Sequence, residues 1–141
     1  MSGYLLDTNC ISELVRARPD RNVLRWMEAA DESLLYLSVL TFGEIRKGLA
    51  SLPQGTRRTR LETWVETELR IRFAGRTLPI DLAAAERWGL LAARAKRQGK
   101  PLSTIDGLLA ATALHHDLTV VSRNVGDFAS TGVQVLDPWN A

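Results

Sequence analysis

Short apolar runs alternate with longer helical segments along almost the whole chain, and this alternation limits the available folds more than any other feature. Apolar runs of strand length cover residues 4–6, 34–39, 77–80, 118–122 and 133–136. Segments with helical periodicity lie between them, at residues 10–16, 22–30, 42–51, 57–73, 82–98 and 105–115. This order is typical of α/β domains, so we predict a central, mainly parallel sheet flanked by helices on both faces.

The size of the chain indicates one domain, which we expect to span residues 1–141. A chain of 141 residues can bury a substantial core, and 45% hydrophobic with 24% charged residues is ordinary for a globular protein. Cys10 is the single cysteine, so no disulfide can form within the chain. No signal-peptide pattern and no apolar run of membrane length is present, so we expect a cytoplasmic protein without a membrane partner.

The basic residues fall into clusters, although the formal net charge is only +2. A net charge this small does not by itself predict nucleic-acid binding. Each cluster can be a solvated helix face, or it can hold the phosphates of a nucleic acid, and the sequence leaves both interpretations open. The clusters are Arg16, Arg18, Arg21 and Arg25; Arg57, Arg58 and Arg60; and Arg94, Lys96, Arg97 and Lys100.

Four acidic residues follow predicted strands or begin predicted helices. Asp7 comes directly after the first apolar run, and Asp127 follows the run at 118–122. Glu44 and Asp106 are expected in the first turns of the helices at 42–51 and 105–115. In open α/β sheets the functional crevice lies beyond the carboxyl ends of the strands, so these four side chains can converge there.

Each of these acids also has a purely local explanation, which the sequence does not exclude. Thr41 to Glu44 and Ser103 to Asp106 both fit the capping box, in which the acid contacts the backbone of the capping residue. Asp7 can cap the helix that begins near Thr8, and Asp127 can close a turn.

If the four acids meet, their chemistry points to a divalent cation. Clustered carboxylates repel one another unless a cation lies between them, and hard oxygen ligands favour Mg²⁺, or Mn²⁺, over zinc. A Mg²⁺ ion bound in this way suits phosphodiester hydrolysis, and Gly43 and Gly107 beside the acids would leave room for a substrate backbone. The two histidines, His115 and His116, are adjacent on a helix, so we expect them to point apart rather than chelate a metal.

Four motifs in order resemble the PIN-domain ribonucleases, and specifically the VapC-type toxins of bacterial toxin–antitoxin pairs. The resemblance covers nearly the whole chain. The motifs are "LLDTNCISEL" at 5–14, "LSVLTFGEIRKGL" at 37–49, "STIDGLLAATALHHDLTVVSRNVGDF" at 103–128, which holds the third and fourth, and the tail "VLDPW" at 135–139.

This resemblance implies a single PIN domain folded as a three-layer βαβ sandwich. It also implies Mg²⁺- or Mn²⁺-dependent endoribonuclease activity on RNA, inhibition by a cognate VapB-type antitoxin, and commonly a homodimer. Carried over by position, Asp7, Glu44 and Asp106 correspond to the core metal ligands, with Asp127 as the fourth acid.

The resemblance implies supporting polar groups as well. Thr8 and Asn9 would lie near a metal-bound water. Asn124 stands where some relatives have an aspartate, so either Asn124 or the downstream Asp127 would supply the fourth group.

Two rival functions remain for this fold class. The first is a catalytically silent PIN module that binds RNA or protein without cleaving it. Asn124, in place of the aspartate of some relatives, favours this alternative, whereas the presence of Asp7, Glu44 and Asp106 argues against it. The second is a phosphatase-like domain with Asp7 as nucleophile, which would need a second acid where Asn9 stands. A phosphate-binding loop and a serine elbow are both missing from the sequence.

Overall fold

The computed structural model describes residues 2–140, and its centre is a parallel sheet in the order β3-β2-β1-β4-β5. All four strand pairs are parallel, as the alternation in the sequence predicts. Each strand is short, and each lies within the apolar run predicted for it. The strands are β1 (Tyr4–Leu6), β2 (Leu35–Ser38), β3 (Thr77–Leu78), β4 (Thr119–Val121) and β5 (Val135–Leu136).

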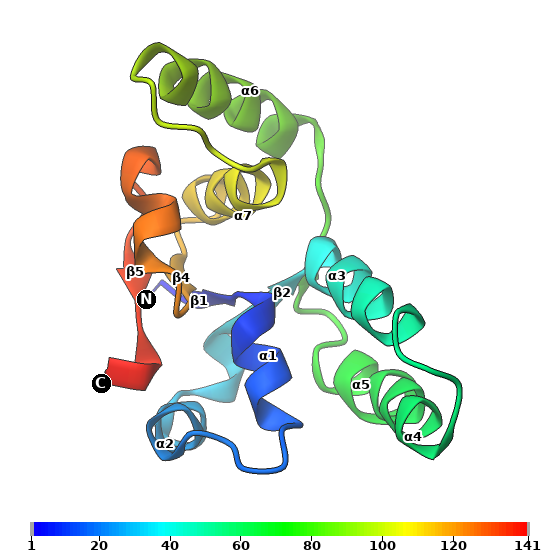
Figure 1. Ribbon diagram of the computed structural model, residues 1–141. Helices are drawn as coiled ribbons and strands as arrows, with labels where there is room; N and C mark the ends of the chain where they lie inside the picture. Colours follow the sequence, from blue (N-terminus) through cyan, green and yellow to red (C-terminus); the bar gives the residue numbers. More distant parts are fainter. Residues whose placement is uncertain (1, 141) are drawn as a thin grey trace.

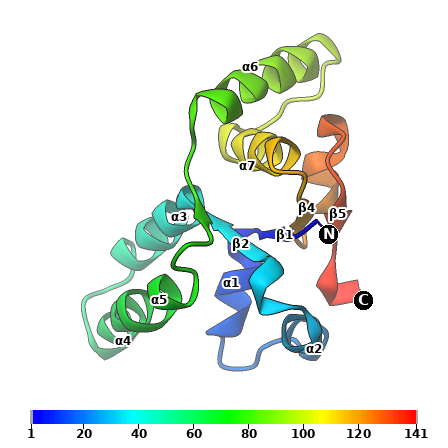
Figure 2. The same cartoon turned by 180° about the vertical axis from the view of Figure 1, so that it is seen from behind.

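Helices cover both faces of this sheet (Figures 1 and 2), so the predicted three-layer βαβ sandwich is confirmed. α1 and α2 lie on one face, whereas α7 lies on the other with α6 packed outside it. α3, α4 and α5 extend from the side of the sheet at β2. The helices are α1 (Thr8–Leu14), α2 (Arg21–Ala29), α3 (Val39–Ala50), α4 (Thr56–Trp64), α5 (Arg70–Arg72), α6 (Leu82–Arg97) and α7 (Thr104–His115).

The central strand places apolar side chains in both layers of the core. Leu6 packs with Ile11 and Val121 in a cluster between the sheet and α1 and α2. Leu5 packs with Leu109 in a second cluster between the sheet and α7. Leu5 and Leu6 are both fully buried. A strand buried on both faces is apolar throughout rather than alternating, which explains why β1 reads as a continuous apolar run.

Two of the differences between the predicted and the observed elements concern the end of β2 and the continuity of the helix after it. The apolar run at 34–39 was expected to form one strand, but β2 ends at Ser38 and α3 begins at Val39. The Ser38 hydroxyl caps α3 by accepting a hydrogen bond from the Leu40 amide at 3.0 Å. The predicted helix at 57–73 is interrupted by a π-helical turn, Val65–Leu69, between α4 and α5. That turn keeps Val65 and Leu69 buried in the core.

Across residues 2–140, the helices fall short of the length and apolar character that a membrane span requires.

Candidate functional site

Asp7 is the first residue after β1, and its carboxylate is almost fully buried, with 6% of the residue exposed. Its Oδ1 accepts a hydrogen bond of 2.8 Å from the Thr8 amide, so Asp7 caps α1, as the local interpretation predicts. Its Oδ2 accepts a hydrogen bond of 2.7 Å from the Ser122 hydroxyl. The cap therefore accounts for only one of the two oxygens, and the second belongs to a contact between distant segments.

Ser122 organises the polar groups around Asp7, although no sequence motif marks this serine. Its hydroxyl is fully buried and also accepts hydrogen bonds from Asn9 Nδ2 at 3.2 Å and from the Asn124 amide at 3.0 Å. Leu6 pairs with Val121 in the parallel register, which brings the next residues, Asp7 and Ser122, together. The shared position after two neighbouring strands is the signal that could have identified this serine.

Glu44 lies in the second turn of α3, not in its first turn as predicted. The helix begins at Val39 under the Ser38 cap, so the predicted capping box from Thr41 to Glu44 is wrong. The Glu44 side chain does not bind the backbone at the start of α3. It extends to α1 instead, where its Oε1 accepts a hydrogen bond of 2.5 Å from Thr8 Oγ1. Thr8 thus contacts one of the four acids, and its role beside a metal-bound water stays a prediction.

Asp106 lies in the first turn of α7, as predicted. The Ser103 hydroxyl caps this helix and accepts a hydrogen bond of 3.2 Å from the Asp106 amide. The Asp106 side chain is half-buried. A carboxylate at a helix N-terminus is favoured by the partial positive charge there, which offsets part of the repulsion from neighbouring acids.

Asp7 and Asp106 have raised pKa values, and the causes connect all four predicted acids. Burial is the largest cause of the raised pKa of Asp7, and the charges of Asp106 and Glu44 raise it further against the lowering effect of the Ser122 hydrogen bond. Burial is again the main cause of the raised pKa of Asp106, with further contributions from Asp127 and Glu44. The four acids therefore form one region of mutually repelling charge.

Asp127 and Asn124 lie at the exposed edge of this region. Asn124 precedes the short 3₁₀ helix Val125–Thr131, and Asp127 lies in its first turn. Both residues are exposed. The Asp127 charge acts on Asp106, whereas Asn124 contributes its backbone amide to Ser122. The choice between them as the fourth site group stays a prediction.

The acidic residues offer a donor set that fits Mg²⁺ or Mn²⁺. All of the groups are carboxylate or hydroxyl oxygens, which hard divalent cations prefer. Within residues 2–140, no three of the four acids bring their ligand oxygens within 4.8 Å of one another. Mg²⁺ retains several of its waters readily, so waters would link these acids to a bound ion at this spacing.

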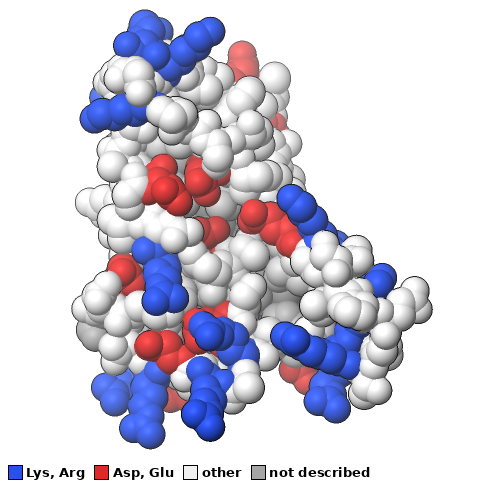
Figure 3. Space-filling view, in the orientation of Figure 1, with Lys and Arg blue, Asp and Glu red and all other residues white. Residues whose placement is uncertain are grey.

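A cleft with both charged and apolar walls adjoins Glu44. A cleft of about 280 Å³ is lined by Thr8 and Glu44, by Trp64 of α4 and by the basic side chains of Arg16 and Arg57. An adjoining hollow of about 650 Å³ is lined by residues of the first two basic clusters: Arg16, Arg18, Arg57 and Arg60. Figure 3 shows acidic side chains near the middle of this face and basic side chains toward its margins.

The two glycines beside the acids differ from each other. A Cβ on Gly43 would meet nothing within 4 Å, which agrees with the predicted open space beside Glu44. A Cβ on Gly107 would lie 2.8 Å from Cδ1 of Trp88, and Gly107 is buried. The prediction that Gly107 leaves room for substrate is therefore wrong, because this glycine permits α6 to pack closely on α7.

Comparisons with known proteins identify relatives of this chain. Residues 4–133 match the family described as PIN domain. The chain is 44% identical to the VapC ribonuclease Y4jK of Sinorhizobium fredii, over 96% of both chains.

Two solved structures share the fold along nearly their whole length. The crystal structure of FitAcB from Neisseria gonorrhoeae superimposes with a TM-score of 0.93 at 38% identity, covering 98% of this chain and 99% of the other. A toxin–antitoxin complex from Klebsiella pneumoniae gives a TM-score of 0.73 at 27% identity, covering 96% of this chain and 98% of the other. The chain therefore belongs to the PIN-domain family, among the VapC-type ribonucleases.

Proposed function

We propose that this protein is a Mg²⁺-dependent endoribonuclease that acts as the toxin of a toxin–antitoxin pair in the cytoplasm. The observation that carries the proposal is the placement of three acids at the carboxyl edge of the sheet: Asp7 caps α1 after β1, Glu44 is bound by Thr8 of α1, and Asp106 lies in the first turn of α7. The charges of Glu44 and Asp106 raise the pKa of Asp7, and that of Asp127 raises the pKa of Asp106. Repelling carboxylates cost stability unless a cation is bound among them, and the cap that Asp7 provides to α1 uses only one of its two oxygens.

The proposed ligands are Asp7, Glu44 and Asp106, with Asp127 at the rim. When bound, Mg²⁺ would supply an activated water and neutralise charge on the scissile phosphate. Mn²⁺ offers similar coordination to the same oxygens.

The remaining polar groups orient these acids. Thr8 holds Glu44 by a hydrogen bond of 2.5 Å, and Ser122 holds Asp7 by one of 2.7 Å. Asn9 donates to Ser122 and thereby fixes the direction of its hydroxyl. Such partners around a ligand commonly change metal affinity or activity by about 10–100-fold when they are removed.

The arginines around the neighbouring hollow would bind RNA phosphates on either side of the scissile bond. Arg16, Arg18, Arg57 and Arg60 belong to two segments far apart in sequence, and the fold gathers them beside the acidic region. A basic margin around an acidic centre binds the flanking phosphates while leaving the reacting phosphate for the metal.

The cleft beside Glu44 supports the proposed antitoxin partner. Its walls include Leu61 and Trp64 next to the acids, so a partner segment with apolar side chains would cover the site when it binds there. One relative of this fold is itself a toxin–antitoxin complex. The exposed Leu82 and Leu90 of α6 add apolar surface that supports the proposed homodimer.

The test is cleavage of single-stranded RNA by the purified chain in Mg²⁺ and in EDTA. We expect cleavage in Mg²⁺ only, and a loss of at least about 100-fold in Asp7→Asn and Asp106→Asn. Asp117→Asn is the matched control, because Asp117 follows the opposite end of α7 and binds Ser2.

Expression of the unmodified chain or of Asp117→Asn should arrest growth, whereas Asp7→Asn and Asp106→Asn should not. The cognate antitoxin should relieve the arrest. Binding of RNA without cleavage, with the same affinity in all variants, would instead identify a silent binding module.

A further inference from the structure

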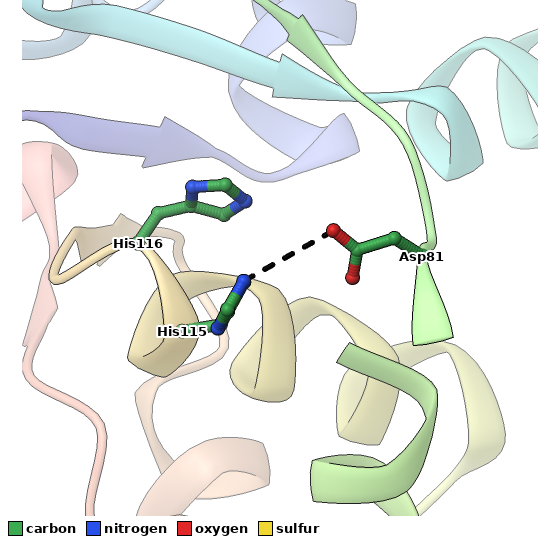
Figure 4. A group of neighbouring side chains, drawn as sticks. All are labelled: Asp81, His115 and His116. Atoms are coloured by element: carbon green, nitrogen blue, oxygen red, sulfur yellow. Dashed lines mark ion pairs between the residues drawn. The ribbon is translucent and has the colours of Figure 1, made fainter. Parts of the chain in front are cut away.

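A second group of potential metal ligands lies outside the acidic region. His115, His116 and Asp81 each direct a ligand atom into one space, and these atoms all lie within 4.8 Å of one another. Figure 4 shows the two imidazoles and the carboxylate converging between the end of α7 and the segment that precedes α6. The expectation that the adjacent histidines point apart is therefore wrong, since their ring centroids are only 4.8 Å apart.

We propose that Asp81, His115 and His116 form a surface site for a divalent transition metal of the Zn²⁺ class. Two imidazoles and one carboxylate are a common protein ligand set for zinc, with the fourth position left to water or to another molecule. Tetrahedral zinc at about 2.0–2.1 Å from each ligand would place the three ligand atoms about 3.3 Å apart. All three residues are exposed, so small side-chain rotations can close the present spacing.

The carboxylate is oriented by its own helix. Asp81 is the N-cap of α6, and its Oδ1 accepts a hydrogen bond of 2.9 Å from the Ala84 amide. Its Oδ2 is left facing His115, 4.0 Å from Nε2. One oxygen is thus used by the cap, and the other is held in place as a ligand.

The histidines also stand on a fixed backbone. His115 is the last residue of α7, and the His116 amide donates a hydrogen bond of 3.1 Å to the Thr112 carbonyl. Asp117 then turns the chain with a φ of 55°, and the Leu118 amide closes the helix end on the Ala113 carbonyl at 2.8 Å. A helix C-terminus carries partial negative charge, which favours a bound cation.

This site is distinct from the acidic region. Asp106 is in the first turn of α7 and His115 is at its end, nine residues later, which corresponds to about 13 Å along the helix axis. Imidazole ligands select zinc-class metals, whereas the carboxylates at the other end select Mg²⁺. A metal here would fasten the segment before α6 to the end of α7.

The test is a Zn²⁺ titration of the full chain, purified without a histidine tag and in excess Mg²⁺, followed by the ring signals of its histidines in NMR. The chain has two histidines, so the two sets of ring signals report on this site alone. We expect both sets of ring signals to change together, and the change to be complete at one equivalent of Zn²⁺. A response of only one histidine, or of neither, at one equivalent would overturn the proposal.

Asp81→Asn gives the second measurement, because asparagine keeps the helix cap while removing the charged ligand. We expect Asp81→Asn to weaken Zn²⁺ binding at least tenfold. Asp117→Asn, which changes the acid directly after His116, should alter Zn²⁺ affinity less than twofold. Equal affinity in Asp81→Asn and the unmodified chain would rule out the carboxylate as a ligand. RNA cleavage plays no part in these readouts, so the result stands apart from the proposed nuclease function.

Discussion

The Ser122 hydroxyl donates a hydrogen bond of 2.7 Å to Oδ2 of Asp7, joining the ends of β4 and β1. Because Ser122 is fully buried, solvent does not compete for this bond. The bond fixes the direction of an acidic side chain that lies in the centre of the proposed site.

Ser122→Ala should therefore reduce RNA cleavage by about 10–100-fold, the usual effect of losing a partner around a metal ligand. The measurement is the cleavage rate across a Mg²⁺ titration. Thr112→Val is the control, because it also removes a buried hydroxyl, one that bonds within α7 to the Leu108 carbonyl. If both variants lose the same fraction of activity, Ser122 acts through general stability and not through Asp7.

Asp106→Asn should make the chain more stable at pH 7 when no divalent ion is present. The pKa of Asp106 is raised by burial and by its acidic neighbours, so the folded state binds a proton more tightly than the unfolded state. Stability from this group is highest below the ordinary pKa and falls as pH rises through the raised one. The side chain is partly exposed and screened, so we expect a gain of roughly 2–4 °C in Tm, about 1 kcal/mol or less.

Thermal unfolding in EDTA at pH 7 measures this effect, and the difference from the unmodified chain should shrink at lower pH. Added Mg²⁺ should raise the Tm of the unmodified chain more than that of Asp106→Asn. A variant that is less stable in EDTA at every pH would contradict the proposed repulsion.

The two glycines beside the acids should respond in opposite ways to alanine. Gly107→Ala places a Cβ 2.8 Å from Cδ1 of Trp88, so it should destabilise the fold by about 1–3 kcal/mol. Gly43→Ala adds a Cβ in open space on the exposed face of α3, so it should stabilise the helix by about 0.5–1 kcal/mol. Urea unfolding of both variants measures the difference, and similar effects of the two substitutions would refute the packing role of Gly107.

Glu32 should stabilise the fold in a pH-dependent manner. It accepts hydrogen bonds from Arg72 at 3.0 and 2.8 Å and from Arg76 at 2.8 Å, and these contacts, Arg72 first, lower its pKa. A lowered pKa gives stability that is complete above the unfolded value of 4.5 and is lost as pH falls through the folded value.

Glu32→Gln should consequently cost up to about 1 kcal/mol at pH 7, and the cost should begin to narrow below pH 4.5. Urea unfolding at a series of pH values measures it, with Glu86→Gln as an exposed glutamate control on α6. A cost that stays constant as the pH is lowered would assign the effect of Glu32 to something other than its charge.

The order of strands and helices could be predicted from the sequence because apolar runs and helical periodicity follow directly from burial on two faces of a sheet. The position of Asp7 after β1 and of Asp106 in the first turn of α7 followed in the same way. Glu44 was predicted in the first turn of its helix but lies in the second, because the sequence pattern did not show that Ser38, rather than Thr41, caps α3. Both residues are good caps, and in the structure Ser38 is the one that caps α3.

The contacts between distant segments were not predictable in the same way. Ser122 became recognisable only once the register of β1 and β4 was known, because its partner Asp7 is 115 positions away. The grouping of His115 and His116 with Asp81 depends on the end of α7 meeting the start of α6, which periodicity alone does not specify. Gly107 likewise owes its role to a tryptophan on another helix.

The most direct test of the central claim is to locate Mn²⁺ in crystals of the chain by anomalous diffraction. We expect a peak between the carboxylates of Asp7, Glu44 and Asp106, with Asp127 at its outer side. The same peak should be lost in Asp106→Asn. Crystals that show no Mn²⁺ among these acids at millimolar concentration, while the RNA-cleaving activity persists, would contradict it.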